Sequence, residues 1–136
     1  MVGIIKMTID EHVKHWIDSA DNDLESAQIL FNSKKYDWCL FLGHLVIEKA
    51  IKAIFVLNNQ NKIPPKTHNL VNLADLSNLK LNSHQEVFLG QVNGFNIEAR
   101  YPQYKQELYK LCTKDFAADY FHRIKDFYKW IKSQIK

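Results

Sequence analysis

Several residue types that would point to a particular class of protein are scarce in this chain of 136 residues. It has two cysteines, Cys39 and Cys112, and neither lies at a spacing typical of metal ligands. We therefore expect buried free thiols in a reducing compartment. Arginine is rare too, because only Arg100 and Arg123 occur among 18 basic residues. Arginine makes most bidentate contacts to phosphates and bases, so this composition, with a net charge of +3, does not by itself indicate a nucleic-acid-binding protein.

Long uninterrupted apolar segments are also absent. The first 14 residues reach acidic side chains before an apolar run of signal-peptide length develops. The most apolar stretch, from Trp38 to Leu57, is interrupted by ionisable residues that would lie in the middle of a bilayer. We therefore expect a soluble, cytoplasmic protein without a membrane span. No segment alternates apolar and polar residues for long, which predicts that there is no β-sheet.

Apolar residues recur at three- and four-residue spacing in three stretches, which predicts three long helices. They cover about residues 10–33, 36–59 and 115–135. Thr8 or Asp10 is placed to cap the first helix, and the short link to the second predicts that these two helices pack antiparallel. The second helix is apolar on almost every side, which is typical of a helix surrounded by other helices.

Shorter helices are expected between the second and third long ones. Asparagines and paired prolines at 58–66 predict an exposed loop. The segment 67–69 then offers a cap for one short helix. Asn82 or Ser83 caps another, with Glu86 at capping-box distance from Ser83.

The last part of the connection is harder to assign. Asn93 and Gly94 are expected to break the second short helix, so that residues 95–102 are irregular and 103–111 form a further short helix. Taken together, the pattern predicts an all-α fold in which residues 1–136 form one domain. Its architecture is an up-and-down bundle of three long helices plus two or three short ones.

The polar residues of the central helix are candidates for a site. His44, Glu48 and Lys52 follow one another at four-residue spacing and lie on one stripe. Buried charge needs partners. His44 and Glu48 could form a metal pair, although no third ligand is visible, or His44 could act as an acid or base. The alternative is an internal ion pair of Glu48 with Lys52 or Arg100, in which His44 is a satisfied hydrogen-bond partner.

The segment from Glu98 to Pro102 contains the second group of candidates. Arg100 could hold a phosphate through its forked donors while Tyr101 or Tyr104 stacks on a base. Alternatively, Arg100 pairs with a carboxylate, either Glu48 or Asp23, and attaches this segment to the bundle.

Two other histidines allow similar pairs of interpretations. His68 either closes the turn before its helix through a hydrogen bond, or faces the same groove as Arg100. His122 lies beside basic residues on the last helix and could belong to an RNA-binding patch. Because Asp119 and Asp126 interleave with those basic residues, an ordinary solvated face is the alternative.

Four groups of residues in this chain occur together in a known family. They are W-x3-A-x2-D-L-x2-A-x2-L (Trp16, Ala20, Asp23, Leu24, Ala27 and Leu30), F-L-x-H-x3-E-K-x2-K-A (Phe41, Leu42, His44, Glu48, Lys49, Lys52 and Ala53), P-x2-T-H-x-L (Pro64, Thr67, His68 and Leu70) and A-R-Y-P (Ala99, Arg100, Tyr101 and Pro102). In this order the chain resembles the HEPN domain, the helical module named for higher eukaryotes and prokaryotes nucleotide-binding. The resemblance covers roughly Trp16 to Tyr128.

This resemblance implies an α-helical up-and-down bundle that is usually dimeric. Bacterial members often accompany a minimal nucleotidyltransferase, as one half of a toxin–antitoxin-like pair. Many members are metal-independent ribonucleases that use an arginine followed, after four to six residues, by a histidine. Neither Arg100 nor Arg123 is followed by a histidine at that distance, so the ribonuclease role is not carried over to this chain.

The prediction is therefore a HEPN-like domain without catalytic residues that forms a homodimer and binds a nucleotide or a nucleotidyltransferase partner. No cofactor and no metal are expected, and RNA remains a candidate ligand. The predicted binding residues are Arg100, Tyr101, Glu98, His44, Glu48, Lys52 and His68. One alternative is a ribonuclease toxin with an altered motif, in which His44 or His68 works with Arg100. The other is a purely structural dimerisation module.

Overall fold

The computed structural model describes residues 7–100 and 109–135, and for residues 97–100 it describes the backbone alone. The described helices are α2 (Ile9–Asn32), α3 (Tyr36–Asn58), α4 (Leu70–Leu76), α5 (Ser83–Arg100) and α7 (Lys114–Ser133). Residues 109–111 are helical as well, and no strand occurs in the described ranges. The predicted all-α fold is confirmed, and the three long helices lie within about two residues of their expected bounds.

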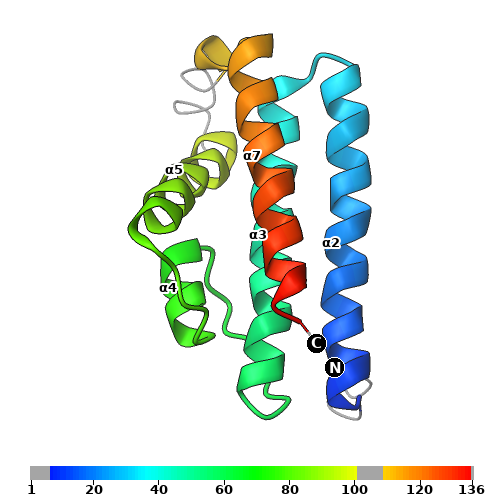
Figure 1. Cartoon of the computed structure of the whole chain (residues 1–136). Helices are drawn as coiled ribbons and strands as arrows, with labels where there is room; N and C mark the ends of the chain where they lie inside the picture. The colour runs from blue at the N-terminus through cyan, green and yellow to red at the C-terminus, as the bar shows by residue number, and fades with distance from the viewer. Residues whose placement is uncertain (1–6, 101–108, 136) are drawn as a thin grey trace.

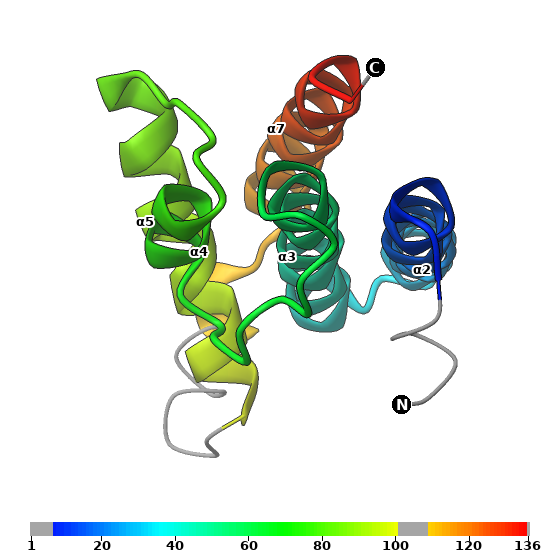
Figure 2. The same cartoon turned by 90° about the horizontal axis from the view of Figure 1, so that it is seen from below.

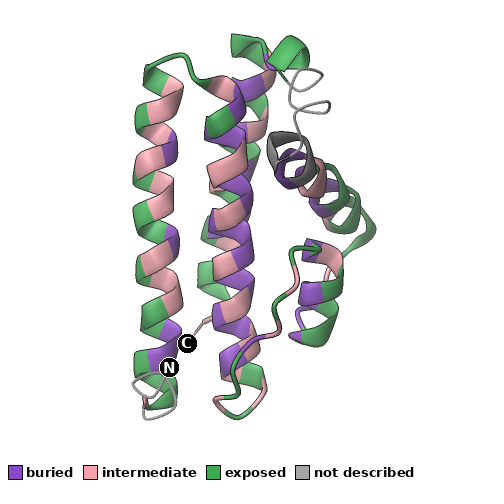
Figure 3. Cartoon of the chain, turned by 180° about the vertical axis from the view of Figure 1, so that it is seen from behind, coloured by how far each residue is buried: buried purple, intermediate pink, exposed green. Residues whose placement is uncertain are grey.

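The three long helices lie side by side, and α4 and α5 cover one side of the bundle (Figure 1). Viewed along its axis, α3 lies between α2 on one side and α4 with α5 on the other (Figure 2), and it contacts all four of the other labelled helices. Buried residues run along most of its length (Figure 3). The sequence of α3 is apolar on almost every side because each face of the helix meets a different neighbour.

Small residues bring the long helices close together. Ala20 and Ala27 of α2 are fully buried in the main core cluster, where larger side chains would separate α2 from its neighbours. Gly43 of α3 lies against α7, and a Cβ atom at this position would lie only 2.8 Å from Cδ1 of Ile124. The hydroxyl of Tyr128 on α7 donates a hydrogen bond of 2.5 Å to Asp21 Oδ1 on α2. These contacts tie α7 to both other long helices.

A capping box begins α2. Thr8 Oγ1 accepts the Glu11 backbone N–H at 3.1 Å, and the Thr8 N–H donates to Glu11 Oε1 at 3.0 Å. Of the two caps that the sequence allows, Thr8 is therefore the one used, and Asp10 lies inside the helix. Together with Glu11 it places negative charge at the positive end of the helix dipole.

Of the two caps expected for α5, Asn82 is the one used. Asn82 Oδ1 accepts the Gln85 backbone N–H at 2.8 Å, and the Asn82 N–H donates to Gln85 Oε1 at 2.9 Å. The capping box is therefore one residue earlier than the expected pair of Ser83 and Glu86. The side-chain amide of Asn82 accepts the same hydrogen bond that a serine hydroxyl would accept at this position. The side-chain amide of Gln85 makes the reciprocal hydrogen bond that a glutamate would make.

The end of α5 corrects the prediction more substantially. The helix continues through Asn93 and Gly94 to Arg100, so the expectation of irregular chain over residues 95–102 is wrong as far as residue 100. Phe95 is 5% exposed and packs edge-on against Tyr120 at 5.2 Å between ring centroids. Burial of this face outweighs the cost of about 1 kcal/mol for a glycine inside a helix.

The loop after α3 is anchored to the start of α2. Asn61 Nδ2 donates to the Met7 carbonyl at 2.7 Å, and Asn61 Oδ1 lies 2.8 Å from Nδ1 of the buried His12. Asn61 has a left-handed backbone with φ of 64°, which asparagine tolerates better than most residues. From this anchor the chain returns along α3 and brings His68 to the central helix.

Candidate functional site

A buried carboxylate on α3 forms the centre of the candidate site. The Glu48 side chain is 5% exposed, and each of its oxygens has a basic partner. Lys52 Nζ donates to Oε2 at 3.1 Å from one turn further along α3. His68 Nδ1, from the loop before α4, lies 2.8 Å from Oε1. An ionised carboxylate only accepts hydrogen bonds, so Nδ1 of His68 carries a proton here.

His44 supports the same loop from one turn earlier on α3. Its ring is fully buried, and its Nε2 lies 3.2 Å from the His68 carbonyl oxygen, to which it donates. Glu48 and His44 therefore hold the side chain and the backbone of His68, respectively. The interpretation of His44 as a satisfied hydrogen-bond partner fits this geometry, and so does the one of His68 as a residue that closes the turn.

The electrostatics favour an ionised Glu48. Burial by itself raises the pKa of this carboxyl. The hydrogen bond from His68, the charge and hydrogen bond of Lys52, and the proximity of His44 together outweigh burial, so the pKa of Glu48 lies below its usual range. Lys52 also lies 5.2 Å from the ring centroid of Trp16 on α2, a cation–π contact that helps to fix the ammonium group.

A small cavity of about 170 Å³ lies beside His68 and is lined by His68, Asn69, Asn93 and Asn96. The His68 side chain is 44% exposed, whereas its partner Glu48 is buried. Asn93 Oδ1 accepts the Leu70 backbone N–H at 2.8 Å and so joins α5 to the start of α4. The site is thus a half-exposed imidazole held by a buried carboxylate, with a wall of asparagines opposite.

Asn93 and Asn96 show which face of α5 borders this cavity. Residues three and seven positions apart lie on the same side of a helix, so the backbone position of Arg100, in the last turn of α5, belongs to the face that carries Asn93. Sequence reasoning missed both asparagines because it treated Asn93 as a helix breaker. Their spacing from Arg100 was the signal that could have identified them.

The predicted site residues therefore fall into two groups. His44, Glu48, Lys52 and His68 come together around one carboxylate. The side chains of Glu98 and Arg100, and all of Tyr101, lie outside the described residues. The described partners of Glu48 are Lys52 and His68.

Asp23, the other carboxylate considered for Arg100, pairs with Lys49 at 2.7 Å. On the last helix, His122 lies 3.3 Å from Asp126 and Arg123 lies 3.8 Å from Asp119. All four of these α7 side chains are at least 42% exposed, as the solvated-face interpretation requires. Cys39 and Cys112 are buried free thiols, as predicted.

Two further observations concern metal ligands and membrane-spanning helices. Within residues 7–100 and 109–135, no group of three or more histidine, cysteine or acidic side chains is placed to hold a metal ion, so His44 and Glu48 gain no third ligand there. In that same part of the chain, no helix is long and apolar enough to cross a membrane.

Comparison with known proteins agrees with this architecture. Searches of curated proteins and of solved structures gave no match. The family described as HEPN domain matches residues 13–134, which is nearly the whole chain. The match includes all of α3 and α7, all of α2 after its first four residues, and both halves of the Glu48–His68 contact. On this evidence the chain belongs to the HEPN domain family.

Proposed function

We propose that this HEPN domain is a non-catalytic, homodimeric module that binds a nucleotide, or a nucleotidyltransferase partner as in toxin–antitoxin-like systems. The observation that carries the proposal is the half-exposed ring of His68, which buried Glu48 holds at 2.8 Å beside a cavity. An imidazole held in one orientation is suited to bind a ligand, because little conformational entropy is lost on contact.

The phosphate contact in this proposal is Arg100, and Tyr101 is the stacking residue. The α5 face that carries Asn93 and Asn96 borders the cavity and continues towards position 100. A guanidinium binds a phosphate through parallel hydrogen bonds. The absence of a histidine four to six residues after Arg100 is the reason for proposing binding without catalysis.

Calorimetric titration of ATP into the protein tests the nucleotide. The wild type is expected to bind, and Arg100→Ala to weaken binding by about 1–3 kcal/mol, the cost of losing a charge-assisted hydrogen bond. Arg123→Ala is the matched control, because it removes the chain's other arginine from the exposed face of α7 and should leave the affinity unchanged. No heat in any of the three samples would remove ATP as the ligand.

The proposed homodimer uses α3. Trp38 is 38% exposed, and Phe41, Leu45 and Phe55 are partly exposed on the same stripe of α3, a helix in which more than half of the residues are buried. Light scattering after size exclusion should give the mass of a dimer for the wild type and of a monomer for Leu45→Glu. Val87→Glu, at a 62% exposed position of α5, is the control that should remain dimeric. A monomeric wild type would rule out this part of the proposal.

A second candidate is ribonuclease activity with an altered motif. The Glu48–His68 contact favours it, because a buried carboxylate that orients a more exposed histidine is also the arrangement of a catalytic base. Two histidines, His44 and His68, were considered for this activity. His44 is completely buried, so His68 is the one of the two that RNA would reach. Cleavage of single-stranded RNA in the presence of EDTA, lost in His68→Ala, would support it. A purely structural dimer predicts neither binding nor cleavage.

A further inference from the structure

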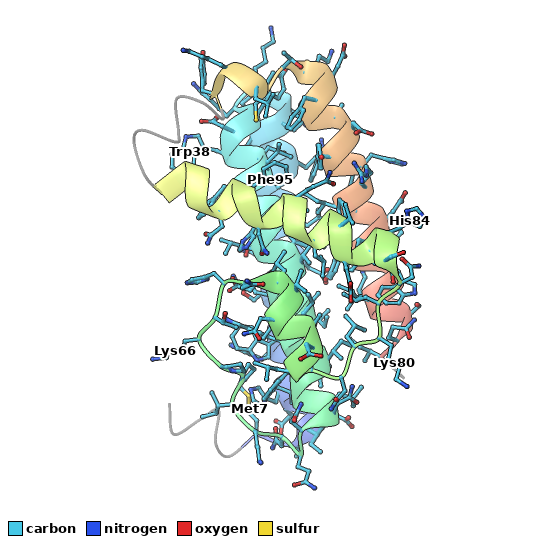
Figure 4. The ribbon with its side chains drawn as sticks, turned by 90° about the vertical axis from the view of Figure 1, so that its left-hand side faces the viewer. Met7, Trp38, Lys66, Lys80, His84 and Phe95 are labelled. Carbon is cyan, nitrogen blue, oxygen red and sulfur yellow. The ribbon has the colours of Figure 1, made fainter. Side chains whose placement is uncertain are left out.

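A second concave surface lies between α5 and α7. It has a volume of about 430 Å³, and we call it the Arg123 groove. The residues that line it are Asn82, His84, Gln85, Phe88, Arg123, Asp126, Phe127 and Trp130. In Figure 4, α5 crosses the bundle with His84 at its beginning and Phe95 towards its other end. The groove therefore uses the first turns of α5, whereas the His68 cavity uses its later turns.

Arg123 is held in the groove by aromatic rings. Its Cζ lies 4.9 Å from the ring centroid of Phe88 and 4.9 Å from that of Tyr120. Its described ion pair is a weak one, because Nη1 lies 3.8 Å from Asp119 Oδ2 and the two side chains are 42% and 64% exposed. The guanidinium thus lies over two aromatic rings, and its contact with the Asp119 carboxylate is a long one.

The rest of the groove is mainly aromatic. Phe88 and Phe127 are 6% and 7% exposed and form its base, with 5.5 Å between their ring centroids. Trp130 is partly exposed and lies 5.4 Å from Phe127. A tryptophan and an arginine around a buried aromatic base are the residue types that dominate binding energy in protein–protein interfaces.

The charges around the groove favour a partner with a single acidic group. Arg123 contributes one positive charge, and Asp126 on the same rim lies 3.3 Å from His122. A nucleic-acid strand gains its affinity from several cations that each meet a phosphate, and carboxylates at positions 119 and 126 would repel it. One carboxylate beside an apolar side chain matches the groove better.

A second copy of this chain fits the groove less well. Two concave surfaces do not fill each other, so a symmetric contact of groove with groove would leave empty space. A contact between the groove and a different surface of the second copy is heterologous, and it produces rings or open chains instead of a two-fold dimer.

We propose that the Arg123 groove is the docking site for a partner protein of different sequence. The partner inserts one apolar side chain against Phe127 and Trp130 and places one carboxylate on Arg123. An amphipathic helix provides both groups on one face when they are four residues apart. This proposal does not depend on the nucleotide site at His68.

The test uses NMR of the isotope-labelled full chain and three synthetic helical peptides with blocked ends. The first peptide has one leucine and, four residues later, one glutamate in a background of alanine and glutamine. The second has glutamine in place of that glutamate, and the third has alanine in place of the leucine. The indole N–H signal of Trp130 reports binding at the groove.

The first peptide is expected to shift this signal and to bind about tenfold more tightly than either of the others, the size of effect expected for one charge-assisted hydrogen bond or one buried aliphatic side chain. In Arg123→Gln the preference for glutamate over glutamine should disappear, whereas the leucine preference should remain. Arg100→Gln is the matched control and should keep both preferences. Circular dichroism checks that each variant is folded.

Each of the following results would overturn the proposal. They are equal binding of all three peptides, a glutamate preference that survives in Arg123→Gln, a larger shift of the Trp130 signal with oligouridylate, and a shift of this signal with protein concentration alone, which would indicate a second copy. An unmoved Trp130 signal with every peptide counts against it as well. Loss of ATP binding in Arg100→Ala concerns only the His68 site, so the two proposals fail independently.

Discussion

Replacement of Glu48 by glutamine should show how much the buried carboxylate contributes to stability. The amide keeps the size of the side chain but removes its charge, and it turns an NH₂ group towards either Lys52 or His68, both of which are donors in the native contacts. Removing one partner of a fully buried ion pair costs about 3–5 kcal/mol. Because Lys52 is 12% and His68 44% exposed, water recovers part of this loss.

We therefore expect Glu48→Gln to lower the free energy of unfolding by about 2–3 kcal/mol. Urea unfolding followed by circular dichroism at neutral pH measures this difference. Glu25→Gln makes the same chemical change at an exposed position of α2 and should alter stability by less than about 0.5 kcal/mol. Equal losses in the two variants would refute the reasoning, because they would show that the contacts of Glu48 add nothing to stability.

The same variant has a defined pH dependence. The pKa of Glu48 is lower in the folded than in the unfolded protein, so its contribution is fully present above the unfolded value of about 4.3. It is lost as the pH falls through the folded value. The stability gap between wild type and Glu48→Gln should therefore narrow in acid, as the pH falls below the unfolded pKa and through the folded one. A gap that widens in acid would contradict the assigned direction.

Two other buried groups give simpler predictions. Tyr128→Phe removes the hydrogen bond to Asp21 and should cost about 1–3 kcal/mol. Burial, then the hydrogen bond and charge of Asp21, raise the pKa of Tyr128, so this stabilisation should be complete below the unfolded pKa of about 10 and fade at higher pH, as urea unfolding over that range would reveal. Burial raises the pKa of the Cys39 thiol to about 12. In a Cys112→Ser variant, Cys39 should resist a thiol reagent at pH 8 until denaturant is added, and rapid reaction of the native protein would contradict this.

Helical patterns that are repeated over long segments of the sequence predicted the fold well. The helices α2, α3 and α7 are each longer than five turns, so the three- and four-residue spacing of apolar side chains is repeated often enough to identify them. The all-round apolar character of α3 predicted its central place, and the structure surrounds it with four other helices. Such patterns are reliable because burial of a whole helix face outweighs any single residue.

Local signals were less reliable for α5. Asn93 and Gly94 have low helix propensity, and on that basis the helix was expected to end there. The structure continues the helix because Phe95 is buried against α7 and because Asn93 uses its side chain to bind the start of α4. Contacts with residues more than 20 positions away decided this boundary, and no local pattern contains them.

The sequence alone determined the all-α class, the three long helices, the membership of the HEPN domain family and the need of Glu48 for partners. Spacing fixes which residues share a helix face, and the free energy of burying charge fixes that a carboxylate there must be paired. Only the tertiary structure decided that His68 is the second partner of Glu48, that Asn96 borders the same cavity, and that Arg123 lies over two aromatic rings. These contacts join separate elements of the chain, and their geometry depends on how the helices pack, which helical periodicity does not specify.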